Sequence, residues 1–192
     1  RVIDCLVETL WRGGRGNDPE AQDLADSAVR IKQEILGPDH PETAASMEQL
    51  GQVLRFKGRY DAARPLLERA LRIREKSLGP DHPHVAGSLG NLAALHKKAG
   101  EYAEASVLLE RALAIQESRL GTSHPEVATT LRNLAAVRRA TGHLQEAREL
   151  YRRACSVLGN AFGIHHPDVA HILGWLADLL FGRRPRPATR SG

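Results

Sequence analysis

The chain has 192 residues, of which 42% are hydrophobic and only 4% aromatic, and its formal net charge is +4. No apolar run approaches the ~18 residues that a membrane-spanning helix requires, and so weak a positive charge does not by itself indicate nucleic-acid binding. The many alanines and leucines favour helices packed through small residues over a β-rich core. The chain starts without Met and shows no secretory leader, so we expect a piece of a longer protein.

The first predicted helix covers residues 1–12, where apolar residues recur at helical spacing. A loose turn follows at 13–17, and a second helix is predicted over 18–36. The segment LGPDHP then closes this helix at Leu36 and opens the next one at Pro41.

That segment recurs along the chain as LGPDHP at 78–83, LGTSHP at 120–125 and FGIHHP at 162–167. Successive copies are 42 residues apart, and a fixed period in the range of about 20–50 residues marks a repeat array. In each copy the glycine can adopt the left-handed conformation that ends a helix, and the proline suits the first turn of the next helix. Between the copies, Gly58, Gly100 and Gly142 recur at the same spacing and indicate a tight turn.

Each repeat is therefore predicted to be two helices joined by a tight turn. The four predicted pairs are 1–12 with 18–36, 41–57 with 60–78, 83–99 with 102–120, and 125–141 with 144–162, and a last helix at 167–182 has no partner. Stacked pairs share a core that one pair cannot bury alone. The fold class is all-α: a right-handed solenoid of antiparallel helix pairs with about nine helices over residues 1–182. Residues 183–192 (RRPRPATRSG) are predicted to be a flexible basic tail.

The sequence resembles the tetratricopeptide repeat family. The residues that carry the resemblance are Leu92-Ala93 in the first helix of a pair, Gly100 and Tyr102 at the turn, and Ala105 and Ala112 in the second helix. The common repeat has ~34 residues, whereas this 42-residue form resembles kinesin light chains and the nephrocystin group. His96 and Arg138 depart from the pattern, which favours an aromatic there, as does the turn after residues 1–12. The resemblance implies a non-catalytic scaffold or adaptor for protein partners.

The sequence gives little support to a catalytic site or a metal site. His40, His82, His124 and His166 lie one repeat apart, so they cannot converge on one ion, and we expect each to stand at a helix start beside proline. No phosphate-loop, nucleophile-elbow or zinc-protease motif is present. We expect no enzyme activity, no metal and no cofactor.

The two cysteines, Cys5 and Cys155, lie near opposite ends of the array. Several helix spacings separate them, which is too far for a disulfide. We expect both to be free, buried thiols in a reducing, cytoplasmic compartment.

The first helices of the pairs are expected to line a concave groove. Their non-packing positions form a stripe on each helix, and a short peptide, acidic or acidic-aromatic, is the predicted ligand. The predicted groove residues are Gln49, Gln52, Arg55, Asn91, Lys97, Lys98, Arg132, Asn133, Arg139 and Trp175. Amides can pair with both the N–H and the C=O of an extended peptide, and the cations favour carboxylates. The resemblance implies that Asn91 and Asn133 contact peptide backbone; the alternative is that they only tie neighbouring helices together.

Two other functions compete with this adaptor hypothesis. The array could be a structural or autoregulatory arm that packs against other domains of a longer chain. Nucleic-acid binding rests on the charge and the arginine-rich tail alone, and the groove lacks the stacked aromatics that single strands need. We therefore expect protein or peptide partners, with no nucleic acid and no membrane insertion.

Overall fold

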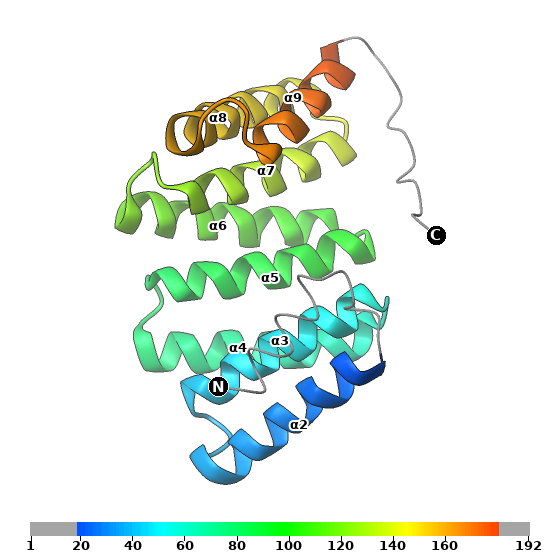
Figure 1. The fold of residues 1–192 in the computed structure, drawn as a ribbon, viewed down its shortest axis with the longest axis vertical. Helices are drawn as coiled ribbons and strands as arrows, with labels where there is room; N and C mark the ends of the chain where they lie inside the picture. Colours follow the sequence, from blue (N-terminus) through cyan, green and yellow to red (C-terminus); the bar gives the residue numbers. More distant parts are fainter. Residues whose placement is uncertain (1–18, 181–192) are drawn as a thin grey trace. The chain divides into compact units, whose positions relative to one another are not determined.

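The computed structural model describes residues 19–180, and α-helices occupy most of them (Figure 1). They are α2 (Pro19–Leu36), α3 (Pro41–Phe56), α4 (Tyr60–Leu78), α5 (Pro83–Ala99), α6 (Tyr102–Leu120), α7 (Pro125–Ala140), α8 (Leu144–Phe162) and α9 (Pro167–Leu180). Each predicted boundary from residue 18 to residue 167 lies within one residue of the observed one. No strand occurs within residues 19–180. The predicted helix over 1–12 and the predicted tail over 183–192 lie outside the described residues.

A histidine caps the start of α3, α5, α7 and α9. Its imidazole Nδ1 accepts a hydrogen bond from the backbone N–H two residues further on, with donor–acceptor distances of 3.1, 3.2, 3.3 and 3.3 Å at His40, His82, His124 and His166 respectively. The caps of α3, α5 and α7 have extended backbones, and proline follows at the first helical position. The predicted place of these histidines beside proline is confirmed, and each satisfies a backbone donor that the helix leaves unpaired.

The glycines of the two kinds of turn have different backbone conformations. At Gly100, which was predicted to mark a tight turn between α5 and α6, φ is 84° and ψ is 6°, the left-handed conformation. At Gly79, after α4, φ is 89° but ψ is 155°, and Gly163 has φ 85° and ψ 161°. This second region is open essentially only to glycine. The left-handed conformation predicted for the glycines of the LGPDHP copies is therefore right in the sign of φ and wrong in ψ at Gly79 and Gly163.

The chain forms two compact units, each described by itself: unit 1 ends at Ile115 and unit 2 begins at Gln116. In unit 1, α3 packs against α2 and α4, α4 packs against α5, and the first helices α3 and α5 also contact each other. Their shared core includes the fully buried side chains of Met47, Leu67, Leu89 and Leu95. In unit 2, α8 packs against both α7 and α9.

Small residues allow close approach of the helices, as predicted. The alanines at two repeat positions of the second helices are all inaccessible to solvent: Ala63, Ala105 and Ala147, and Ala70, Ala112 and Ala154. The facing first helix is equally constrained, because a Cβ added to Gly51 would lie only 2.7 Å from Cγ of Leu67. The helices of a pair therefore interlock through positions that admit little more than alanine.

Candidate peptide-binding face

Six of the predicted groove residues lie on α3 and α5 in unit 1. They are Gln49, Gln52 and Arg55 on α3, and Asn91, Lys97 and Lys98 on α5. All but Lys98 are half-buried, and Lys98 is exposed. Because α3 and α5 contact each other, the structure brings these six residues onto neighbouring helices. We call this set the α3/α5 face.

Two polar atoms of the α3/α5 face are buried without a hydrogen-bond partner among the described residues, namely Oε1 of Gln49 and Nε of Arg55. Burial also lowers the pKa of the Arg55 guanidinium, against a smaller opposing effect of Tyr60. Buried polar atoms normally have partners, and an unpaired one calls for an explanation. A bound peptide group is one such explanation.

The two predicted asparagines differ in their surroundings. The side chain of Asn91 makes no hydrogen bond with the residues that the structure describes, whereas Asn133 has an interaction within the chain. Lys97 likewise has an internal partner. The alternative role of tying the chain together therefore has support at Asn133 and none at Asn91.

Four predicted groove residues lie in unit 2: Arg132, Asn133 and Arg139 on α7, and Trp175 on α9. Arg132 forms an ion pair with Asp168, with 3.1 Å between Nη1 and Oδ1. The Trp175 ring lies 5.4 Å from that of Tyr151 and 6.4 Å from that of His171, between ring centroids. Arg132 is thus largely neutralised, and Trp175 belongs to an aromatic cluster on α8 and α9.

Tyr151 is a residue of this region that the sequence analysis missed. It is 0% exposed, and its hydroxyl has no hydrogen-bond partner among the described residues. Burial raises the pKa of the Tyr151 hydroxyl, and the nearby Arg139 and Arg132 oppose this shift. The repeat pattern could have predicted that Tyr151 is buried, since the positions one and two periods earlier are the buried leucines Leu109 and Leu67.

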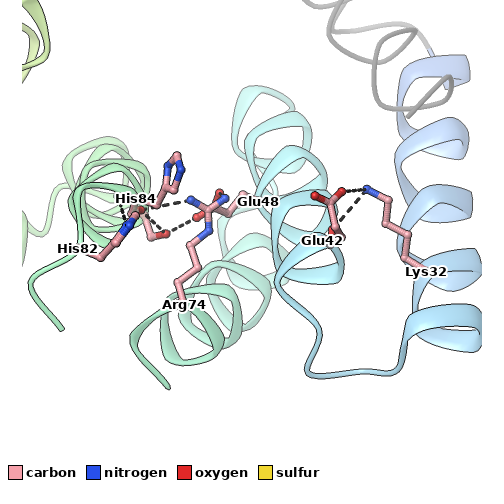
Figure 2. A network of polar contacts seen from close by, with 7 residues as sticks. Lys32, Glu42, Glu48, Arg74, His82 and His84 are labelled. Carbon is pink, nitrogen blue, oxygen red and sulfur yellow. Dashed lines mark hydrogen bonds and ion pairs between the residues drawn. The ribbon is translucent and has the colours of Figure 1, made fainter. Parts of the chain in front are cut away.

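A largely buried polar network holds α3, α4 and α5 together (Figure 2). Arg74 on α4 forms an ion pair with Glu48 on α3, with 2.7 Å between Nη2 and Oε2. Its Nη1 also donates to the backbone carbonyl of His84, at 3.2 Å. Ser88 on α5 donates to the second carboxylate oxygen of Glu48. One period earlier, Lys32 donates to the carbonyl of Glu42 in the same way as Arg74 to that of His84.

The two departures from the expected aromatic position have polar partners. His96 is 7% exposed, and its Nδ1 lies 2.5 Å from Oε2 of Glu101. Arg138, at the same position of the next repeat, pairs with Glu146, with 2.8 Å between Nε and Oε2. A polar contact with an acidic residue at or near the start of the following helix thus takes the place of aromatic packing.

Neither a metal site nor a disulfide emerges from residues 19–180. No group of three histidine, cysteine, aspartate or glutamate side chains is placed there to hold a metal ion. Cys155 is free, but it is half-buried and not buried as predicted, and Cys5 lies outside the described residues. None of the described helices has the length and apolarity that crossing a membrane would require.

The family model described as Tetratricopeptide repeat matches residues 10–76, 48–118, 84–160 and 126–189. No curated protein matches the sequence. Among solved structures, the nearly identical TPR-like repeats of a Podosopora anserina protein described as a kinesin light chain are 29% identical, with a TM-score of 0.77 over 96% of this chain and 87% of that one. A single-substitution variant of those repeats gives a TM-score of 0.78 with the same identity and coverage.

BtubC (BKLC) from P. vanneervenii, at 20% identity, shares the fold with a TM-score of 0.77 over 99% of this chain and 84% of that one. Arrays of this kind are typically non-enzymatic scaffolds for contacts between proteins. The predicted all-α, kinesin-light-chain-like class is confirmed by these similarities and by the helix pairs described above. The chain therefore belongs to the tetratricopeptide repeat family, as an interaction scaffold built from the long, kinesin-light-chain-like form of the repeat.

Proposed function

We propose that the chain is an adaptor that binds a short acidic or acidic-aromatic peptide through the first helices of its pairs. The observation that carries this proposal is the unsatisfied polar chemistry of the α3/α5 face. Gln49 and Arg55 each bury a polar atom without a partner among the described residues, and Asn91 stands one period after Gln49.

Oε1 of Gln49 and Nε of Arg55 are closed to solvent in the free chain, so an extended peptide would become their hydrogen-bond partner once these side chains rotate towards it. The carboxamides of Gln49 and Asn91 can donate to and accept from peptide backbone. Arg55 can bind a carboxylate, and its partial burial strengthens the attraction because water screens it less. An acidic ligand also complements Lys98, the exposed cation of the face.

Unit 2, considered by itself, offers an aromatic contact to a peptide bound there. Trp175 is half-buried against Tyr151, and Arg139 lies close enough to Tyr151 to influence its pKa. An aromatic or apolar side chain of the peptide would pack on Trp175, and a neighbouring carboxylate would meet Arg139. Arg132 contributes less, because Asp168 already neutralises it.

The test is a panel of short fluorescent peptides measured by anisotropy against the whole chain. The panel contains an acidic-aromatic peptide, the same sequence with Asp and Glu changed to Asn and Gln, and the same sequence with its aromatic residue changed to Ala. Binding should weaken by about tenfold on loss of the carboxylates, because ionic hydrogen bonds contribute about 1.5–3 kcal/mol each. Equal binding of the acidic and amide peptides would overturn the proposal.

A further inference from the structure

A second candidate binding site lies on α4 in unit 1. A pocket of about 450 Å³ opens where the loop between α2 and α3 meets the C-terminal half of α4. Its lining residues are Asp39, Arg69, Arg72, Ile73, Lys76 and Ser77, and none of them belongs to the predicted peptide-binding residues. The volume is within the range of about 300–1,000 Å³ that is usual for small-ligand sites.

The charges in this pocket do not balance. Arg69 is committed to the fold: it pairs with Asp39 at 3.2 Å and donates to the carbonyl of Pro38 at 3.3 Å. Arg72 and Lys76 are both exposed, and neither has an ion pair or hydrogen bond with any residue that the structure describes. Three cations therefore face one carboxylate, which leaves an excess of two positive charges.

The partial negative charge at the C-terminal end of α4 does not neutralise the excess positive charge of the pocket. Lys76 lies in the last turn of α4, where the helix dipole presents a partial negative charge of roughly half a unit. Even after this is subtracted, the pocket remains strongly positive. Arg72 and Lys76 are four residues apart and so project from the same side of the helix.

Packing of the repeats does not require this pair of cations. The equivalent positions in the other second helices hold Arg30 and Glu34 in α2, Ala114 and Ser118 in α6, and Ser156 and Asn160 in α8. By contrast, the arginine equivalent to Arg69 forms an ion pair in each of the next two repeats: Arg111 pairs with Glu75, and Arg153 pairs with Glu117. Two adjacent unpaired cations at these positions thus distinguish α4 from the other described second helices.

We propose that this pocket binds a phosphate monoester in its dianionic form. Such a group carries between about −1.5 and −2 charges at neutral pH and has three strong acceptor oxygens, which matches the excess of two cations. Arginine can grip two of those oxygens with its planar fork, and lysine acts as a compact charge beside it. A single carboxylate would leave one of the two cations uncompensated.

The direct test titrates inorganic phosphate into the whole chain, with NMR chemical shifts of the α4 amides as the readout and ionic strength held constant with chloride. We expect saturable, one-to-one binding that is tighter at pH 8 than at pH 5.5, because phosphate is a dianion at the higher pH. The variant Arg72→Gln with Lys76→Gln should bind at least about tenfold more weakly, since hydrogen bonds between ionised groups are about twice as strong as neutral ones.

The matched control is Arg30→Gln with Arg152→Gln, which removes the same charge from exposed positions outside the pocket and should leave phosphate affinity unchanged. Circular dichroism melts establish that both variants fold. Absence of saturation in the native chain, or equal weakening in the two variants, would overturn the proposal. Arg55→Gln should not change phosphate binding, so this site stands or falls separately from the peptide-binding face.

Two further arms identify the source of the phosphate. One probe is O-phosphoserine, and the other is a short alanine-based peptide with phosphoserine at its centre. A peptide affinity at least about tenfold above that of the free amino acid would assign the pocket to a phosphorylated partner protein, because only flanking residues could add such contacts. Equal affinities would assign it to a small phosphorylated molecule. Failure of both probes to bind more tightly to the native chain than to the α4 variant would count against the site.

Discussion

Glu48 on α3 and Arg74 on α4 form an ion pair, with 2.7 Å between Oε2 and Nη2, in which the carboxylate side chain is only 9% exposed. Burial nevertheless raises the pKa of Glu48 above its ordinary value of 4.5, and the attraction of Arg74 and the hydrogen bond from Ser88 only partly oppose it. The free-energy cost of burying the carboxylate charge thus exceeds the stabilisation that the ion pair gives it, as is common for buried pairs.

This balance predicts different effects for two substitutions at Glu48. Glu48→Ala should lower the free energy of unfolding by about 3 kcal/mol, because it leaves a mostly buried guanidinium without its partner. Glu48→Gln should cost about 1 kcal/mol or less, since an amide oxygen can still accept from Arg74 or Ser88. Urea unfolding at neutral pH measures both. Equal losses in the two variants would contradict the account of the pair.

The same shift predicts a pH dependence. A carboxyl whose pKa is raised by folding binds its proton more tightly in the folded state, so the stability it contributes falls as pH rises from 4.5 through the folded pKa. The native chain should therefore lose stability relative to Glu48→Gln across that interval and remain level above it. Unfolding curves at a series of pH values test the sign: a native chain that gains on the variant with rising pH would show that the ion pair outweighs burial.

Glu101 is predicted to behave in the opposite way. Hydrogen bonds from Arg64, at 2.7 and 2.8 Å, and then the contact with His96, hold the pKa of Glu101 below its ordinary value. A lowered pKa contributes stability that is present above pH 4.5 and is lost as pH falls through the folded pKa. The stability difference between the native chain and Glu101→Gln should shrink as the solution is acidified. A difference that stays constant down to the acid transition would argue against these contacts.

The histidine caps give a fourth prediction. His124→Ala should destabilise the chain by about 1 kcal/mol, because the backbone N–H of Glu126 loses its acceptor. His124→Asn should recover most of this loss, since asparagine is among the favoured capping residues. Thermal unfolding of the three chains side by side is the measurement. An equal loss in the alanine and asparagine variants would mean that the imidazole acts through packing and not through its Nδ1.

The shared core of unit 1 gives a fifth prediction. Leu92 is 5% exposed within the core cluster of unit 1, and Leu92→Asp would place a carboxylate there without a partner. The cost should be several kcal/mol in a chain whose net stability is of the order of 5–15 kcal/mol. Circular dichroism should therefore show a greatly lowered melting temperature. An unchanged melt would contradict the packing of α5.

The helices were predictable from the sequence because each is bounded by local chemistry. Gly79, His82 and Pro83 lie within a few residues of one another and fix both helix ends without reference to the rest of the fold. The repeat then extended the assignment to weaker copies such as FGIHHP, whose first, third and fourth residues differ but whose His166 and Pro167 keep the register.

The polar network and the aromatic cluster were not predictable in the same way. Glu48 and Ser88 are 40 residues apart, and their contact depends on Arg74 reaching both helices. The 42-residue period does not reveal these residues, since the position equivalent to Glu48 is Gly90 one repeat later. The site residues were predicted as a stripe, but the sequence did not show that Asp168 neutralises Arg132 or that Asn133 has an internal partner.

The most direct test of the central claim is isothermal titration of the acidic-aromatic peptide into the native chain and into Asn91→Ala, with Asn133→Ala and Arg152→Gln as controls. We expect Asn91→Ala to weaken binding by about tenfold, because unpaired peptide groups cost about 1–3 kcal/mol. Asn133→Ala should have a smaller effect and Arg152→Gln none. An unchanged dissociation constant for Asn91→Ala, at an unchanged melting temperature, would contradict peptide binding at the α3/α5 face.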